Sequence, residues 1–309
     1  MRLVALLVVA VLCGPVQDSE DDFPEKPGPV SATVNGWLIS QDRVERFVTR
    51  KLAGRPVTET VMRRLRAEAL EQLVRRQVIL EYLKTTRYWP RGGGAIEMRI
   101  GQLQKRLAQV NKDLQQHLQE NGMSRAELEN EIAWEIAWQQ FLQAWLSEER
   151  LDQYYQQRQR EFDGTRLKVA HLLLRANRGE SSTEVIGRAE AVRDQIRLGQ
   201  STWPGAVSEY SLAESSISQD GLVGWIGFDG PMPPEFSRAA FQLDPGQISP
   251  AVETTAGVHL IKCLEIEPGS AGRRDVEPAL RAAMTGEIFD QLAQQKRQDV
   301  DVQYDPPGD

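Results

Sequence analysis

The chain has 309 residues, of which 40% are hydrophobic and 26% are charged, a composition typical of folded globular proteins and not of disordered chains. This length allows two domains of ordinary size. The net charge is −7, and every cluster of lysine and arginine has acidic residues nearby. Together these features argue against a nucleic-acid-binding surface.

Residues 1–16 are predicted to be a secretory signal peptide. Arg2 precedes an unbroken apolar run at residues 3–12, and an acidic, polar stretch follows shortly after it. A membrane-spanning helix needs about 20 apolar residues, so an uncleaved membrane anchor is the alternative. Cys13 raises the question of lipid attachment, but Leu12 is bulkier than a lipidation signal requires at that position. We therefore expect an exported protein of the bacterial periplasm or cell envelope.

The few cysteines and histidines limit the disulfide bonds and metal sites that the chain can form. Cys13 and Cys263 are the only two cysteines, and the first is expected to leave with the signal peptide, so no internal disulfide is expected in the mature chain. Three histidines and one cysteine at these spacings form no recognisable metal site. We predict neither a metal nor a cofactor.

The region from residue 30 to residue 162 is predicted to be mostly helical, after a proline- and acid-rich linker at 17–29. The glycine run at 92–94 lacks the lysine and hydroxyl residue of a phosphate-binding loop, so it is predicted to be a hinge and not a nucleotide site. Caps and apolar spacing predict a short strand at 32–39 with an Asn35-Gly36 turn signal, then helices at 40–52, 58–84, 95–120 and 125–145, and a polar helical stretch at 148–161.

Aromatic residues recur along one face of the predicted helix at 125–145. They are Trp134, Trp138, Phe141 and Trp145, at helical spacings of four, three and four. Such a stripe is typical of packing between helices. A peptide-binding groove lined by some of these rings is the alternative.

Residues 166–267 have a different sequence pattern, which predicts short strands, helices and glycine turns in the order of a β-α-β domain. Two of the strands each carry one histidine within an apolar, period-two run, His171 in the first and His259 in the last. A single buried histidine is usually a core residue whose ring nitrogens are hydrogen-bonded and which has no further function. Because a polar ring is costly in such a run unless it finds a partner, we expect the two imidazoles to face each other across one sheet.

Several motifs of this segment stand out together. They are Ala170-His171-Leu172-Leu173, Glu209-Tyr210-Ser211, the turn at 220–226, the stretch from Pro234 to Pro250, and Thr255 to Lys262. Over about 100 residues these motifs resemble the parvulin family of peptidyl-prolyl isomerases. The resemblance implies a four-stranded, antiparallel-type sheet and catalysis of X-Pro isomerisation.

The resemblance also implies the residues of the site. His171 and His259 are the paired imidazoles, with the Thr254 hydroxyl as a candidate partner. Met232 and Phe236 correspond to the family's shelf for the proline ring, with Leu222 or Ile226 as walls. The alternative is that Met232 and Phe236 are only core residues.

One position departs from the family pattern. Parvulins carry a cysteine or aspartate shortly after the Tyr-Ser pair, whereas this chain has Ala213 there, followed by Glu214. Alanine can neither ionise nor donate a hydrogen bond, so weak activity is one expectation. In the loop after the first strand only Arg175 and Arg178 are basic, with Glu180 beside them, which does not make a phosphate-binding cluster.

Three segments of the helical region form a pattern: Ala32 to Gly36 followed by a helix, the helix containing 70–80, and Asn121 to Ser124 before another helix. This pattern resembles the amino-terminal domain of SurA- and PrsA-like exported chaperones. In such proteins a last helix returns to that domain. Residues 273–304 have the matching pattern, a helix and then a strand expected beside residues 33–34.

The sequence thus predicts an α+β protein in which a mostly helical domain at 30–162 is completed by 273–304, and a parvulin domain occupies 166–267. The predicted function is isomerisation of X-Pro bonds in unfolded or secreted polypeptides, the expected partners, combined with chaperone activity. The alternative is a non-catalytic holding chaperone that uses an inactive parvulin domain to bind peptides. An assembly scaffold for an envelope partner is a third possibility.

Overall fold

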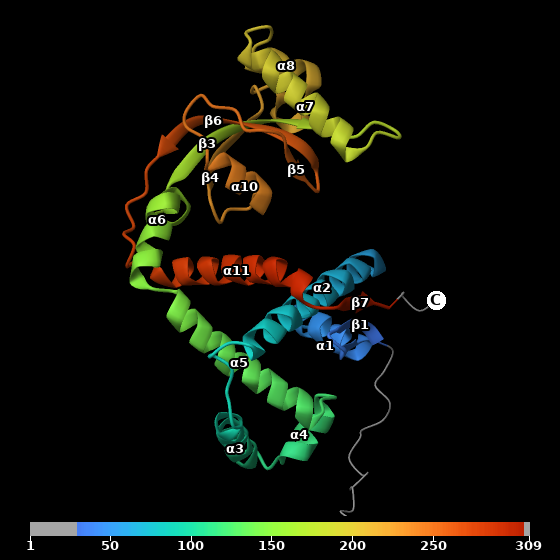
Figure 1. The fold of residues 1–309 in the computed structure, drawn as a ribbon. Coiled ribbons are helices and arrows are strands. Elements are labelled where there is room, and N and C mark those ends of the chain that lie inside the picture. The colour runs from blue at the N-terminus through green and yellow to red at the C-terminus, as the bar shows by residue number, and fades with distance from the viewer. Residues whose placement is uncertain (1–29, 306–309) are drawn as a thin grey trace, which may run out of the picture. The chain divides into compact units, whose positions relative to one another are not determined.

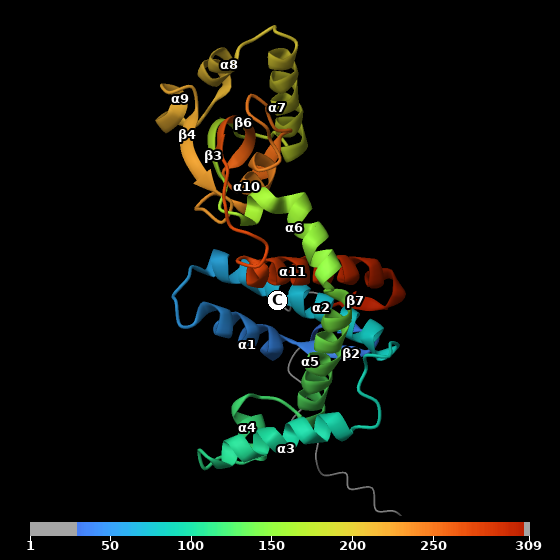
Figure 2. The same cartoon turned by 90° about the vertical axis from the view of Figure 1, so that its left-hand side faces the viewer.

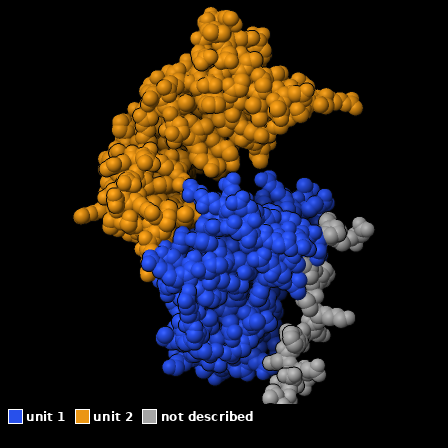
Figure 3. Space-filling model, in the orientation of Figure 1, with its two compact units in different colours: residues 1–141, 289–309 blue, residues 142–288 orange. Residues whose placement is uncertain are grey.

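The computed structural model of the protein describes residues 30–305 (Figures 1 and 2). The predicted signal peptide at 1–16, including Cys13, and the linker at 17–29 lie outside the described residues. Two compact units divide the chain (Figure 3): the first ends at Phe141 and resumes at Phe289, and the second is Leu142–Ile288. The fold is α+β, as predicted.

The first unit contains a three-stranded antiparallel sheet of order β2-β1-β7. Its strands are β1 Val30–Val34, β2 Trp37–Ser40 and β7 Val302–Tyr304. The predicted single strand at 32–39 is therefore a hairpin, because Asn35 and Gly36 both have positive φ (+48° and +78°), as a two-residue turn requires. The strand expected beside residues 33–34 is present, with Gln303 opposite Thr33.

Two helices cover this sheet, and both begin where the sequence places a capping hydroxyl. Ser40 accepts a hydrogen bond from the backbone N–H of Arg43, and Thr58 accepts one from Val61. The helices are α1 Gln41–Leu52 and α2 Glu59–Lys84. Their apolar faces and the sheet share one buried cluster, formed by Ala32, Val34, Ile39, Val44, Val48, Ala69, Leu73, Val74 and Val78.

The helix predicted at 95–120 is instead two helices, α3 Gly94–Ala108 and α4 Leu114–Glu120. Asn111 breaks the run with a φ of +56°. Asp113 then starts α4 through a capping box with Gln116. The prediction was wrong because apolar spacing continues through the break, whereas local capping by Asp113 stabilises a new start.

Helix α5, Arg125–Trp145, opens with the predicted capping box of Ser124 and Glu127. Its aromatic stripe packs within the protein. Trp134 and Phe141 are 9% and 8% exposed, and Trp138 stacks between them with ring centroids 5.3 and 5.4 Å away. The edge-on ring of Phe289 meets Trp134 and Trp138. These contacts favour the packing interpretation of the stripe.

The second unit includes the helix α6 Glu148–Phe162 and most of α11 Glu277–Lys296, which is followed by the short 3-10 helix Arg297–Asp299. Leu151 of α6 packs with Leu280 and Met284 of α11. Between these helices the chain runs out to a sheet domain and back.

The segment that leaves α6 for the sheet domain and the segment that returns to α11 are joined by hydrogen bonds. Asp163 accepts hydrogen bonds from the N–H and the hydroxyl of Thr165, and the Thr165 hydroxyl accepts one from the N–H of Gly269. The Ala271 N–H donates to the Asp163 carbonyl. A Cβ on Gly269 would lie 2.1 Å from the Asp163 carbonyl oxygen, so only glycine allows this approach.

The sheet domain has four antiparallel strands in the order β4-β3-β6-β5. The strands are β3 Arg166–Leu174, β4 Leu222–Gly227, β5 Val252–Thr254 and β6 Gly257–Glu267. The helices are α7 Ser182–Arg197, α8 Trp203–Tyr210, α9 Glu214–Ile217 and α10 Pro234–Ala240.

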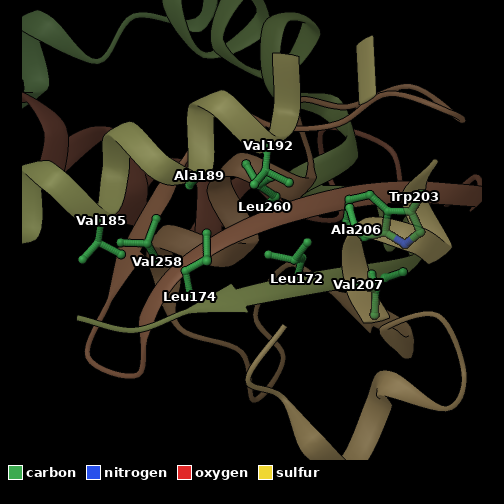
Figure 4. Packing of buried hydrophobic residues seen from close by; sticks show 11 residues of the cluster. Leu172, Leu174, Val185, Ala189, Val192, Trp203, Ala206, Val207, Val258 and Leu260 are labelled. Atoms are coloured by element: carbon green, nitrogen blue, oxygen red, sulfur yellow. The ribbon is translucent and has the colours of Figure 1, made fainter. Parts of the chain in front are cut away.

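The two faces of this sheet bury different cores. On one face, Leu172, Leu174, Val258 and Leu260 pack against α7 and α8, as Figure 4 shows. On the other face, Leu167, Val169 and Ile261 pack around Phe236 of α10. This division follows from the period-two alternation of β3 and β6.

No helix among residues 30–305 is long and apolar enough to cross a membrane.

Candidate functional site

The sheet register brings His171 and His259 together. His171 on β3 lies opposite Ile261, and His259 on β6 lies opposite Leu173, so the two histidines are diagonal neighbours on the face that packs against α10. Their Nδ1 atoms are 3.1 Å apart. The rings are nearly parallel, at 20°, with centroids 5.3 Å apart.

Thr254 extends this row across the next strand. It lies on β5, two residues beyond Val252, the residue opposite His259. The Thr254 Oγ1 atom is 2.8 Å from Nε2 of His259, and it also accepts a hydrogen bond from the backbone N–H of Ala256. Both nitrogens of His259 therefore have partners.

The hydroxyl of Thr254 decides the order of protons along the row. If it donates to Nε2 of His259, then Nδ1 of His259 carries a proton and donates to His171. If the hydroxyl instead donates to the carbonyl of Gly257, 3.3 Å away, His259 donates from Nε2 and accepts from His171 at Nδ1. The outward nitrogen of His171, Nε2, is a donor in the first arrangement and an acceptor in the second.

Both imidazoles are held neutral. Burial lowers the pKa of His171. Burial, together with the nearby His171 and Arg175, lowers the pKa of His259 to about 4. A second proton on His259 would put protons on both of its nitrogens, and neither arrangement above allows this, because in each of them one nitrogen of His259 accepts a hydrogen bond. The row is therefore an uncharged, hydrogen-bonded chain at neutral pH.

Phe236 forms the wall behind the imidazoles. Its ring centroid is 6.0 Å from that of His171 and 5.5 Å from that of His259, with both rings meeting it edge to face. Phe236 is completely buried, so it fixes the histidines from behind and offers no surface to a ligand in this structure. Met232 packs against the same core cluster and is only half-buried.

The two predicted wall residues behave differently. Ile226 is 5% exposed and belongs to the core around Phe236. Leu222 lies opposite Ala170, on the sheet face that packs against α7 and α8, so the structure does not bring it to the histidines. The cause is a bulge in the pairing of β3 and β4, which leaves the neighbouring Val223 packed on the Phe236 side. Sequence alternation carries no signal for this bulge.

The turn before β4 fits closely against His171. The backbone N–H of His171 donates to the Gly221 carbonyl. A Cβ on Gly221, whose φ is +78°, would lie 2.1 Å from the carbonyl oxygen of His171. Only glycine therefore allows the turn to approach this histidine.

Sequence reasoning missed the role of Ser211. Its buried hydroxyl accepts hydrogen bonds from the N–H groups of Leu173 and Ala213, which fixes the loop to the end of β3. Ala213 then precedes α9 as its N-cap, without a side-chain cap. Glu214, the first residue of α9, is exposed. The position that carries a cysteine or aspartate in parvulins thus holds only a methyl group.

The structure therefore brings His171, His259 and Thr254 into one row, with Phe236 behind it and Met232 beside that core, while the roles of these residues stay predictions. Among residues 30–305 no three histidine, cysteine or acidic side chains are grouped so as to hold a metal ion.

Comparison with known proteins assigns this segment to a family. Residues 171–265 match the rotamase family, described as the PPIC-type PPIase domain. The chain therefore contains a domain of the parvulin type at these residues. It is 24% identical over 265 residues to chaperone SurA of Aromatoleum aromaticum, covering 78% of this chain and 57% of that protein. It is 37% identical over 116 residues to chaperone SurA of Burkholderia thailandensis, covering 38% of this chain and 24% of that protein. The chain thus spans less than two thirds of these relatives.

Solved structures with detectable similarity include the peptidylprolyl isomerase PrsA of Bacillus anthracis. It is 18% identical, and the match covers 74% of this chain and 96% of that one, with a TM-score of 0.38. A PpiC-type peptidyl-prolyl cis-trans isomerase domain is 24% identical over 36% of this chain and 98% of that one, with a TM-score of 0.32.

Proposed function

We propose that this chain is an exported chaperone whose sheet domain isomerises X-Pro bonds in unfolded or secreted polypeptides. The observation that carries the proposal is the hydrogen-bonded row of Thr254, His259 and His171 against the ring of Phe236. The match of residues 171–265 to the PPIC-type domain supports the reaction. Similarity to SurA, together with the apolar leader sequence, supports a location in the periplasm or cell envelope.

The chemistry follows from the nature of the barrier. Rotation about a peptide bond must cross about 20 kcal/mol, and an unaided X-Pro bond turns over in tens to hundreds of seconds. The twisted transition state has lost amide resonance and part of its dipole, so a weakly polar surface binds it better than the planar ground state. No proton, metal or covalent intermediate is required.

The residues of the row suit this task. Neutral imidazoles avoid placing a charge beside the twisted amide. The His171 ring is only half-buried, and no described residue hydrogen-bonds its Nε2, so this nitrogen is free to contact a bound peptide. The half-buried side chain of Met232 supplies apolar surface for the proline ring. Phe236 and Ile226 act from behind, as positioning residues.

A second candidate function is holding of unfolded chains without catalysis. It is favoured by Ala213, which supplies neither a thiol nor a carboxylate, and by the complete burial of Phe236. In this case the parvulin domain would bind peptides without turning them over.

Thr254→Val separates the two candidates, because valine keeps the shape of threonine but leaves Nε2 of the buried His259 without a partner. A buried group that loses its hydrogen bond costs about 1–3 kcal/mol. We expect kcat/KM for a short X-Pro peptide to fall about 10-fold. Suppression of aggregation of a heat-denatured client, measured on the same protein, should stay unchanged.

Thr255→Val is the matched control, since this neighbouring threonine is exposed and should keep wild-type turnover. Unchanged turnover in Thr254→Val would show that the hydrogen-bonded row does not contribute to catalysis. If the wild-type protein has no turnover at all, only the holding function stands. Phe236→Ala is a poor probe, because emptying a fully buried aromatic site costs about 3–5 kcal/mol of stability.

A further inference from the structure

The loop that carries Met232 joins β4 to α10, and its backbone is anchored on both sides of this residue. Before it, the Gly230 N–H donates to the carbonyl of Gly227, the last residue of β4. A Cβ on Gly230 would lie only 3.0 Å from that carbonyl oxygen, so the turn lies close to the strand end. After it, the Pro233 carbonyl accepts a hydrogen bond from the N–H of Ser237 in α10. Met232 therefore lies on a short span between two fixed points.

Prolines confine the backbone of this span. Met232 has Pro231 on one side and Pro233 on the other, and Pro234 follows. A proline ring fixes its own φ at about −65°, and Pro233 has φ of −53° and ψ of 142°. The residue before a proline is also restricted, to extended or polyproline conformations. This second restriction applies to Met232, so its backbone is confined from both sides.

The Met232 side chain combines this confined backbone with an adaptable end. It packs against the cluster around Phe236 and is only half-buried, so part of its surface stays open. Methionine has three rotatable side-chain bonds and fits its shape to a contact. If the backbone beneath it were flexible as well, a bound ligand would have to restrict that motion too, at a cost in affinity.

The three prolines differ in what the fold requires of them. Pro234 is the first residue of α10, a position at which proline commonly starts a helix. Pro231 is exposed and Pro233 is half-buried, and neither has this role. A proline in a compatible conformation also stabilises a protein by restricting its unfolded chain, so a test has to separate stability from ligand binding.

We propose that Pro231 and Pro233 are positioning residues, which hold Met232 as a preformed shelf for the proline ring of the substrate. The proposal rests on the isomerase activity proposed above and adds two residues to its site. The shelf contacts the ring and not the rotating bond, so it binds the planar and the twisted substrate alike. Loss of the two prolines should therefore raise KM and leave kcat unchanged.

The double variant Pro231→Ala/Pro233→Ala, in the full chain, tests the proposal. Alanine accepts the φ of proline, so this variant should fold. The measurements are kcat and KM for the short X-Pro peptide, and Kd of the same peptide labelled with fluorescein. We expect KM and Kd to rise about 5-fold, with kcat within about 2-fold of the wild-type value. Glycine at both positions frees the backbone further and should raise KM about 10-fold.

Pro204→Ala is the matched control. Pro204 is an exposed proline of the same domain, in α8, which packs on the other face of the sheet. Its replacement should leave kcat, KM and Kd at their wild-type values.

A double-mutant cycle with Met232→Ala ties the effect to the shelf. Met232→Ala alone should raise KM. In that background, replacing Pro231 and Pro233 with alanine should raise KM by less than about 1.5-fold further, because no long side chain is left to position. A change that acts only through stability would be as large as in the wild-type background.

A fall in kcat with KM unchanged would overturn the proposal, because the prolines would then only preserve the fold of the site. Unchanged KM and Kd would overturn it as well, and so would an undiminished rise in KM in the Met232→Ala background. If the wild-type protein binds the peptide without turnover, the proposed isomerisation fails, whereas a higher Kd in the double variant would still support the shelf. A wild-type protein that does not bind the peptide would refute both.

Discussion

His259 combines burial with complete hydrogen bonding. It is 4% exposed, accepts or donates at both ring nitrogens, and lies edge-on to Phe236. A charged imidazole has no place in this arrangement, so the row depends on neutrality. This dependence makes the sheet sensitive to pH.

We predict that the sheet domain loses stability as the pH falls from 6.5 towards 4. Unfolded histidine binds a proton near pH 6.5, whereas burial, His171 and Arg175 lower the pKa of folded His259 to about 4. The unfolded state therefore binds more protons in this window, and stability present above pH 6.5 is lost, by about 3 kcal/mol. Hydrogen exchange of β3 and β6 amides, corrected for intrinsic rates, measures it.

His259→Gln provides the comparison, because glutamine hydrogen-bonds but does not titrate. This variant should be less stable than wild type at pH 7 and should lose less stability on acidification. Equal losses in the two proteins would show that carboxylates, and not this histidine, dominate the acid sensitivity of the domain.

At the scale of single residues, the sequence could predict the histidine pair but not the surroundings of the pair. Two histidines in period-two apolar runs are buried at least cost when their rings are hydrogen-bonded to each other, and the pairing of β3 with β6 places them as neighbours. The position of Leu222 depends on a bulge, which involves pairing between distant residues and has no local sequence signal. The complete burial of Phe236 depends on how α10 packs, which spacing does not determine.

Among the elements, the turn into β4 offers a test of close backbone approach. Gly221 and Gly224 both have positive φ, +78° and +101°, but a Cβ would clash with His171 only at Gly221. We predict that Gly221→Ala destabilises the sheet domain by more than about 2 kcal/mol, whereas Gly224→Ala costs about 1 kcal/mol from backbone strain alone. Chemical denaturation followed by hydrogen exchange in β3 measures both.

Similar losses in the two alanine variants would mean that the turn relaxes away from β3 and that the approach is not tight. In that case kcat/KM should fall in Gly221→Ala, because the backbone that fixes His171 would have moved. Turnover in Gly224→Ala serves as the reference.

The start of a helix was predictable where a hydroxyl side chain caps its first turn, as at Ser40, Thr58 and Ser124. The break between α3 and α4 was not, although Asp113 and Gln116 form a capping box there. Apolar residues continue at helical spacing on both sides of Asn111, so the spacing predicted one continuous helix although Asp113 could cap a new one. A polar Asn-Lys-Asp triplet inside a periodic run was the signal that the sequence offered.

Across the whole molecule, the first unit is completed by residues from both ends of the described chain. Val302 of β7 lies opposite Val34 of β1 and packs against the core beneath the sheet, whereas Gln303 is exposed. We predict that Val302→Asp lowers the free energy of unfolding of this unit by about 2 kcal/mol, because it places a carboxylate against apolar residues. Hydrogen exchange of the β1 amides checks it.

Gln303→Asp introduces the same carboxylate on the exposed side and should change stability by less than about 0.5 kcal/mol. Equal effects would indicate that β7 contributes only backbone pairing. Prolyl turnover should be unaffected in both variants, since the histidine row draws on none of these residues.

The segments that leave α6 and return to α11 meet at Thr165 and Gly269, and Leu151, Leu280 and Met284 join the two helices without help from the sheet domain. A domain attached in this way is an insert with adjacent ends, so a chain that lost it would need only a short bridge from residue 163 to residue 271. Gain, loss or duplication of such an insert during evolution would leave the apolar contacts between α6 and α11 in place. The sheet domain and its host can therefore evolve at independent rates.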